Sequence, residues 1–177
     1  MSDHLIIAPP KPQEYPASFE QYIKLVPSKD LLSYFESQKE SVASIAVNLS
    51  EEQLLYRYAE GKWSIKDICS HVIDCERVYN YRALCIARGD KMDLPAFDEN
   101  EYARQAHADL RDIADIISEY RAVRASTIEL YKSFTADMLD RMGSADSRKR
   151  SVRSMGYIAA GHELHHISVI KEKYLKH

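Results

Sequence analysis

Two histidines near the end of the chain have the spacing of a metal-binding helix. His162 and His166 are four residues apart, so on a helix both imidazoles project from one face, about one turn apart. Two neutral imidazoles placed in this way can bind one divalent ion, as in the zinc-protease helix. A pair of histidines satisfied within an apolar core is the alternative, so a third ligand elsewhere in the chain would decide between them.

The segment 151–175 is predicted to be the helix that carries both histidines, with Ser151 as its N-cap. At about 100° per residue, both histidines share one sector, about 120° wide, with apolar side chains. These apolar side chains are Met155, Ile158, Ala159, Val169 and Ile170. The two imidazoles should therefore face the interior, whereas His165 lies at the edge of the sector and should support the site or be exposed. Glu163 lies about 80–100° from His162 on the wheel, so it is a poor candidate for a general base.

His71 is the best candidate for a third ligand. It lies on a second predicted helix, 64–88, which Ser64 and Asp67 begin with a capping-box pattern. On the wheel of this helix His71 lies near the edge of the apolar face, beside Cys75. A histidine at the rim of the core, bonded to a backbone carbonyl, is the alternative. His71 is nevertheless the only histidine outside the last helix that is expected to face the interior, which makes it the natural third ligand.

Two further helices would complete a bundle around these side chains. Apolar residues recur at helical spacing over 29–48, after Ser28 as an N-cap, and over 109–134. The segments 89–108 and 135–150 are predicted connections, and the first is long enough to be functional or to have short structure of its own. Since no segment alternates like a strand, the sequence predicts an all-α four-helix bundle, a fold that builds metal sites from facing helices.

Residues 1–27 differ from the rest of the chain. They contain five of the six prolines, which lack the backbone donor and fix φ, so this segment is predicted to be an extended lead-in. Apolar side chains such as Tyr15, Phe19 and Tyr22 are expected to dock the lead-in on the bundle. We therefore predict a single metal-binding domain over 28–177 with the lead-in packed against it.

Composition excludes several classes of partner. A formal net charge of −3 predicts no binding to nucleic acid or to an anionic membrane, and the basic run Arg148-Lys149-Arg150 is expected to be a solvated loop. No apolar run approaches the ~20 residues of a membrane span, and the start lacks the pattern of a signal peptide. Three cysteines on one predicted helix cannot form a disulfide framework, so we expect a reducing compartment, the cytoplasm.

One apolar stripe of the last helix suggests a further contact. Tyr157, Leu164 and Leu175 lie roughly opposite the histidines, where a simple surface helix would be polar. Three such residues along one stripe predict a contact with a helix of another subunit or with the N-terminal lead-in. Of these two alternatives we favour a homodimer.

Several motifs, from about residue 49 to the C-terminus and in the same order, resemble the DinB/YfiT-like superfamily. They are Gly61-Lys62-Trp63-Ser64, then His71 with Asp74 and Glu76, the runs 81–90 and 94–100, and the closing Gly161-His162-Glu163-Leu164-His165-His166. The resemblance implies an up-down-down-up four-helix bundle in which His71, His162 and His166 bind a divalent metal ion. Zinc and nickel are the first choices, with iron and manganese as alternatives. Val169 stands where many relatives have Gln, which weakens any inference about substrate contacts and thiols.

Three imidazoles leave a divalent ion with open positions, at which a water or a thiol can ionise near neutral pH. The hypothesis is therefore a metal-dependent enzyme, either a thiol S-transferase or a hydrolase, that acts on a small molecule; its catalytic side chains are not assigned. A non-catalytic metal-binding or stress-related protein and an interaction module with unoccupied histidines remain alternatives. Arg82 and Asp98 are candidates for a substrate pocket, although a buried ion pair that ties the 89–108 loop to the bundle would explain them equally well.

Overall fold

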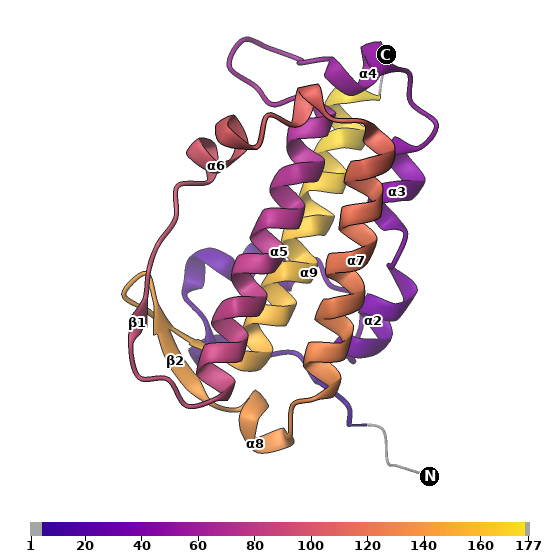
Figure 1. The fold of residues 1–177 in the computed structure, drawn as a ribbon. Helices are drawn as coiled ribbons and strands as arrows, with labels where there is room; N and C mark the ends of the chain where they lie inside the picture. The colour runs from indigo at the N-terminus through magenta and orange to yellow at the C-terminus, as the bar shows by residue number, and fades with distance from the viewer. Residues whose placement is uncertain (1–4, 176–177) are drawn as a thin grey trace.

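The computed structural model describes residues 5–175, and long helical segments that pack side by side dominate it (Figure 1). The long segments are α5 (Ile65–Ala87), α7 (Ile113–Lys132), α9 (Val152–Val169) with a π turn (Ile170–Tyr174), and the pair α2 (Leu31–Ser37) and α3 (Ser41–Ala46). In Figure 1, α5 and α7 run from top to bottom and α9 runs from bottom to top. Helix α5 packs against both α7 and α9, so it is the element that joins the bundle.

Two helices begin where the sequence predicts. The Ser64 hydroxyl accepts a hydrogen bond from the backbone N–H of Asp67, 3.0 Å away, and the Asp67 carboxylate accepts one from the backbone N–H of Ser64. This reciprocal capping box confirms the predicted start of α5. Ser151 likewise caps α9 by accepting from a backbone N–H of the first turn. These caps set the starting points of the two helices that carry the histidines.

Two other helix starts differ from prediction. Helix α2 is capped by Asp30, whose side chain accepts from the backbone of its first turn, while the Ser28 hydroxyl donates to the Asp30 carbonyl. Helix α7 begins at Ile113, four residues later than predicted, because Asp112 accepts from the N–H of Ala114 and caps it there. In both places the helix begins directly after an aspartate whose carboxylate accepts a hydrogen bond from a backbone N–H of the first turn, and not at the predicted residue.

The prediction of one unbroken helix over 29–48 is wrong. The chain leaves the helix after α2 and resumes it at α3. At the break, the carbonyl of Gln38 accepts hydrogen bonds from the Tyr120 hydroxyl (3.1 Å) and from Nη1 of Arg124 (3.2 Å), both on α7. This carbonyl thus satisfies buried polar groups of a neighbouring helix, and the helical ladder is interrupted there.

A small sheet lies at one end of the bundle, so the all-α prediction is only approximate. Strand β1 (Asp93–Leu94) pairs in parallel with β2 (Met142–Ala145), which pairs antiparallel with β3 (Arg148–Ser151). Strands of two to four residues are too short to show alternation in a sequence. The basic run within β3 is also not a solvated loop, because Arg150 is buried while Arg148 and Lys149 are exposed.

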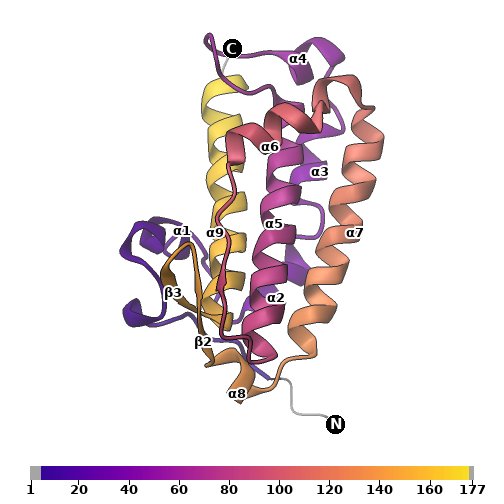
Figure 2. The ribbon, with the colours of Figure 1, turned by 60° about the vertical axis from the view of Figure 1, so that its left-hand side comes forward.

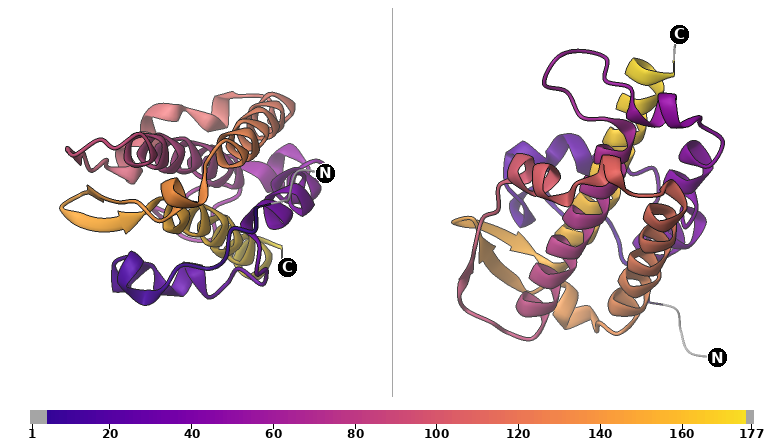
Figure 3. Two further views of the ribbon diagram at one scale, coloured as in Figure 1. Left: turned by 90° about the horizontal axis from the view of Figure 1, so that it is seen from below. Right: turned by 45° about the horizontal axis from the view of Figure 1, so that its top comes forward.

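Short helical segments fill the connections between the long helices (Figure 2). They are α1 (Glu20–Ile23), α4 (Glu51–Leu55), α6 (Glu99–Ala106), α8 (Ala136–Leu139) and the 3₁₀ turns Pro12–Glu14, Ala17–Phe19 and Ala108–Leu110. The predicted long connection 89–108 therefore contains a strand and a helix of its own. Seen from below the bundle, the β2–β3 hairpin and the segment around α1 extend from the same side (Figure 3).

The N-terminal lead-in packs against α9. Ile7 is buried, and its carbonyl accepts hydrogen bonds from the backbone N–H of Leu31 (3.0 Å) and from the hydroxyl of Tyr157 (2.9 Å). The backbone of the lead-in contacts the backbone of α9 at Gly161, where an added Cβ would lie 1.9 Å from the backbone oxygen of Tyr22. Only glycine permits this contact between α9 and the lead-in.

Two apolar clusters form the core, and a polar layer separates them. Among the buried members on α9 and its π turn, one cluster extends to Ala160 and the other begins at Ile170; His162 and His166 lie between them. On α7 the clusters are separated in the same way around the buried Arg124. Buried polar groups in such a layer need partners, which makes the layer the place to look for chemistry. None of the helices within 5–175 is long and apolar enough to cross a membrane.

Candidate metal centre

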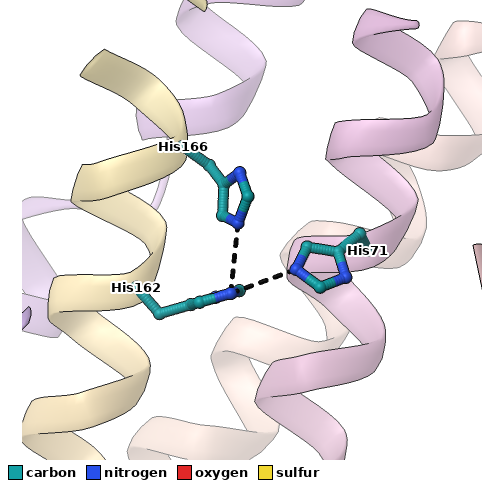
Figure 4. A group of neighbouring side chains, drawn as sticks. All are labelled: His71, His162 and His166. Carbon is teal, nitrogen blue, oxygen red and sulfur yellow. Dashed lines mark hydrogen bonds between the residues drawn. The ribbon is translucent and has the colours of Figure 1, made fainter. Parts of the chain in front are cut away.

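The structure brings His71, His162 and His166 together between α5 and α9 (Figure 4). The Nε2 atom of His162 lies 3.1 Å from Nε2 of His71 and 3.1 Å from Nε2 of His166. One ligand nitrogen from each of the three rings falls within 4.8 Å of the other two. Nitrogens from two facing helices therefore point at one small region of space.

Burial keeps these imidazoles neutral. It lowers the pKa of His71 to about 4 and, together with the neighbouring His71 and His165, lowers the pKa of His166 to about 3. The pKa of His162 is also lowered well below its ordinary value, first by burial and then by the other histidines. At neutral pH all three rings are thus uncharged, and a metal ion would meet lone pairs instead of competing with protons.

The donor set fits a divalent metal ion. In a tetrahedral site with metal–nitrogen bonds of ~2.0–2.1 Å, two ligand nitrogens lie about 3.3 Å apart, close to the two separations of 3.1 Å that His162 makes with His71 and His166. The Nδ1 atom of His166 is buried without a hydrogen-bond partner among the described residues, so the polar contact of this ring is through Nε2. Imidazole nitrogens suit zinc, nickel, copper and iron. The three side chains are therefore competent ligands for such an ion.

Aromatic rings surround the cluster. The indole of Trp63 lies over His71, with ring centroids 4.5 Å apart, and is stacked on His166 at 6.2 Å. Tyr22 of the lead-in meets the edge of His162 at 5.6 Å, and Tyr79 of α5 meets it at 6.0 Å. Such rings limit the access of bulk water and fix the imidazole orientations. The exposed His165 contacts Tyr22 and His166 but is not one of the three converging rings.

Glu163 belongs to a separate buried ion cluster, which we call the Arg124 cluster. The guanidinium of Arg124 donates to both carboxylate oxygens of Glu76 (3.0 and 2.9 Å) and to the carboxylate of Glu163. Glu163 also accepts hydrogen bonds from Ser41 (2.6 Å) and Tyr120 (2.9 Å). The hydrogen-bonding capacity of its carboxylate is therefore used by groups on α7 and α3, so Glu163 is excluded as a general base beside the histidines. Glu76 is the other carboxylate that pairs with Arg124.

A cleft of about 170 Å³ reaches the cluster at His162. We call it the His162 cleft; its polar lining includes Tyr22, Tyr79, Arg82, Glu99 and Arg150. A larger cavity of about 510 Å³ lies on the other side of Trp63, and none of the three converging histidines lines it. Of these two hollows, the His162 cleft is therefore the one that connects solvent with the imidazoles.

The two predicted pocket residues lie in different places. Arg82 lines the His162 cleft, donates from Nη2 to the carbonyl of Pro95 (2.7 Å) and lies over the ring of Phe97. Asp98 caps α6 by accepting from the backbone N–H groups of the following turn, and it lines a separate depression with Phe97. Each thus holds the 89–108 connection in place, but through backbone groups rather than through an ion pair between them.

Sequence reasoning missed several residues of the cleft. The sequence predicts Arg150 to be part of a solvated run, because three consecutive basic residues conceal which one a short strand turns inward. Glu99 gave no signal of its own, because an acidic residue at the start of a short helix is ordinary capping composition. Tyr22 was expected to dock the lead-in, but nothing in the sequence indicated that it would do so against His162.

The fold and the site together define a helical bundle with a cluster of three converging histidines, of which His71 and His162 are buried and His166 is partly buried. The chain belongs to the DinB superfamily, whose family model matches residues 34–170. This confirms the resemblance inferred from the motifs.

Relatives and a solved structure agree with that assignment. "Putative metal-dependent hydrolase OB0413" of Oceanobacillus iheyensis is 27% identical over 142 residues, covering 79% of this chain and 81% of the relative. "Uncharacterized protein YjoA" of Bacillus subtilis is 25% identical over 142 residues, covering 78% and 83%. YfiT from Bacillus subtilis, described as a probable metal-dependent hydrolase with an unusual four-helix bundle topology, superposes with a TM-score of 0.66 at 15% identity, covering 92% of this chain and 89% of YfiT. At that identity the likeness shows the fold alone, and it confirms the four-helix bundle.

Proposed function

We propose that this chain is a metal-dependent enzyme in which His71, His162 and His166 hold a divalent ion on an up-down-down-up bundle. The convergence of three neutral Nε2 atoms at the end of a cleft carries this proposal. Zinc or nickel is the expected ion, with iron or manganese as alternatives. The substrate is a small molecule that enters through the His162 cleft, because a volume of about 170 Å³ has room for only part of a ligand that fills an ordinary pocket of ~300–1,000 Å³.

The reaction we favour is hydrolysis, in line with the names given to OB0413 and YfiT. A bound divalent ion supplies Lewis acidity, which favours ionisation of a water or a thiol near neutral pH. The neutral imidazoles position this group without adding negative charge. Glu99 lines the same cleft as His162 and is the candidate to accept the proton released there. Trp63 shields the cluster from bulk water at His71 and His166, while Tyr22 packs against His162 in the wall of the cleft.

Transfer of an external thiol is the second reaction that the site could support. The chain's own thiols do not serve this purpose: burial raises the pKa of Cys75, which lies 3.7 Å from Nδ1 of His71, and burial also raises the pKa of Cys69. A thiol S-transferase would therefore need a low-molecular-weight thiol as co-substrate. The three cysteines are free, which supports the proposal that the protein acts in the cytoplasm.

Metal analysis of protein purified without an affinity tag tests the ligand assignment. We expect about one divalent ion per chain in the wild type and its loss in His166→Ala. His165→Ala is the matched control, because His165 is adjacent in sequence but exposed. If both variants retain metal equally, the assignment of His166 is wrong.

Activity assays then decide between an enzyme and the alternative, a non-catalytic metal-binding or stress-related protein. Metal-loaded protein is tested on a panel of esters, amides and other electrophiles, with and without biological thiols. His71→Ala is the control, and we expect it to abolish turnover. Full activity in that variant would refute metal-dependent catalysis, while metal binding without turnover in any assay would favour the alternative. The close cover of Trp63 over His71 is the observation that favours this alternative.

The homodimer remains a prediction, although part of the stripe that suggested it has another explanation. Tyr157 is fully buried under the lead-in, to which its hydroxyl is bonded, and Leu164 and Leu175 are partly buried against the two apolar clusters. Light scattering at micromolar concentration measures the mass directly. A monomeric mass would count against the homodimer and leave the metal centre unaffected.

A further inference from the structure

Two arginines from distant parts of the chain meet in the His162 cleft. Arg82 comes from α5 and Arg150 from β3, and both line the cleft although the two residues are only 5% and 1% exposed. None of the ion pairs within 4.0 Å in the described part of the chain involves either of them. Burying cations without counter-charges is unfavourable, so a structure that keeps two of them side by side needs an explanation.

The contacts of these two side chains orient the guanidinium groups without neutralising them. Arg82 donates to one backbone carbonyl, and Arg150 donates from Nη1 to the carbonyls of Ala145 and Arg148. The Nε atom of Arg150 is buried and has no hydrogen-bond partner in the described part of the chain. A guanidinium has five N–H donors, and carbonyls carry no full charge, so both donors and positive charge remain for a ligand.

The protein also contains a buried arginine that is paired with carboxylates. Arg124 is equally buried, and two carboxylates surround it in the Arg124 cluster. In the cleft, burial lowers the pKa of both Arg82 and Arg150, and the charge of Arg82 lowers that of Arg150 further, while Asp146 acts on both in the opposite direction. The arginine that serves the core is thus paired with carboxylates, whereas the two beside the histidines are not.

Two acidic residues also line the cleft. Asp146 lies in the β2–β3 turn with a left-handed φ of 55°, and its carboxylate is partly exposed and lies 3.8 Å from Nη2 of Arg148. Glu99 begins α6 at the rim. Neither is within ion-pair distance of Arg82 or Arg150, and Asp146 acts on both arginines only at longer range, so no carboxylate among the described residues pairs directly with either guanidinium.

We propose that Arg82 and Arg150 form an anion subsite that binds a carboxylate or phosphate group of a small molecule beside His162. The planar guanidinium fork matches both groups through paired N–H···O bonds. The Nε–H of Arg150, unpartnered among the described residues, shows that the protein itself does not fully satisfy this guanidinium. The subsite itself stands on the cleft alone; its role in holding a substrate rests on the proposed metal-dependent function. Together they specify an anionic substrate whose reactive group lies next to the histidines.

Isothermal titration of the full, untagged chain with inorganic phosphate and with succinate tests the subsite. We expect Arg82→Gln and Arg150→Gln each to raise the Kd at least about tenfold, equivalent to ~1.4 kcal/mol. Arg148→Gln is the matched control, because it removes the same charge from the same strand at an exposed position, and it should change the Kd less than about threefold. Tighter binding of phosphate identifies a phosphate-bearing ligand, and tighter binding of succinate identifies a carboxylate.

Three further measurements keep the outcome clear. Thermal unfolding checks that each variant is folded; if Arg150→Gln is not, Arg150→Lys, which keeps the charge but loses the fork, replaces it and should weaken binding. The Nε–H resonance of Arg150 should shift on addition of phosphate. In His166→Ala, phosphate binding should persist without metal, so failure of the metal site and failure of the subsite give different results. Absence of binding to the wild type, or equal weakening in Arg148→Gln, would overturn the proposal.

Discussion

Replacing Arg124 by methionine should remove a large part of the stability of the fold. The side chain is 1% exposed, and its loss leaves the carboxylates of Glu76 and Glu163 buried without their cation. Removing one partner of a buried ion pair costs about 3–5 kcal/mol. The pKa of Glu163 is already raised by burial, so this carboxyl can take up a proton, which keeps the cost within that range despite two stranded groups. Against a total of ~5–15 kcal/mol for a domain, urea unfolding at pH 7 should show a much lower midpoint.

Arg121→Met on the same helix is the matched control. Arg121 also forms a two-pronged ion pair with a glutamate, Glu40, but its side chain is 53% exposed. Exposed pairs contribute only about 0–1 kcal/mol. If Arg124→Met costs less than ~1 kcal/mol, or no more than Arg121→Met, the two buried carboxylates are stabilised without the guanidinium and the account of the polar layer is wrong.

Three other predictions concern the site and its cover. Gly161→Ala should destabilise the protein by ~1–3 kcal/mol, measured by urea unfolding, because its methyl group would collide with the backbone of Tyr22. Without metal, the stability of the fold should decrease as the pH falls from about 6.5 towards 4, and the histidines should leave it unchanged above 6.5. The folded-state pKa values of His71 (about 4) and His166 (about 3) lie below the ordinary value of 6.5, so the unfolded chain binds more protons in that window. Acid titration followed by circular dichroism checks the direction. Iodoacetamide should label Cys85 first, since the other two thiols are buried; peptide mass spectrometry would show the order, and early labelling of either buried thiol would contradict it.

The sequence predicts the parts of the fold that local chemistry specifies. The caps Ser64 and Ser151 accept hydrogen bonds within their own first turns, so short-range pattern is sufficient to place α5 and α9. The histidines follow from the same logic, because the i, i+4 spacing fixes His162 and His166 on one face. His71 needed only one assumption, namely that an inward-facing histidine on a neighbouring helix would meet them.

Features decided by long-range contacts could not be predicted in this way. The break after α2 depends on which groups of α7 reach the carbonyl of Gln38, and those groups lie more than 80 residues away. The inward turn of Arg150 depends on pairing with a hairpin partner, and the place of Tyr22 depends on how the lead-in crosses α9. In each case contacts between residues distant in the sequence determine the local structure, and the local pattern does not.

The imidazoles and the walls of the cleft come from different parts of the fold, which affects how the ligand preference of this protein can change. The three converging imidazoles are on α5 and α9, whereas much of the cleft wall comes from the lead-in, the 89–108 connection and the β2–β3 hairpin. Surface connections tolerate insertion and replacement far better than packed helices. Exchanging a few residues around Phe97, or lengthening the turn at Asp146, would therefore reshape what the cleft admits while the imidazole geometry stays intact. Diversification of ligand preference in this scaffold can thus proceed through its periphery, with the helical frame held constant.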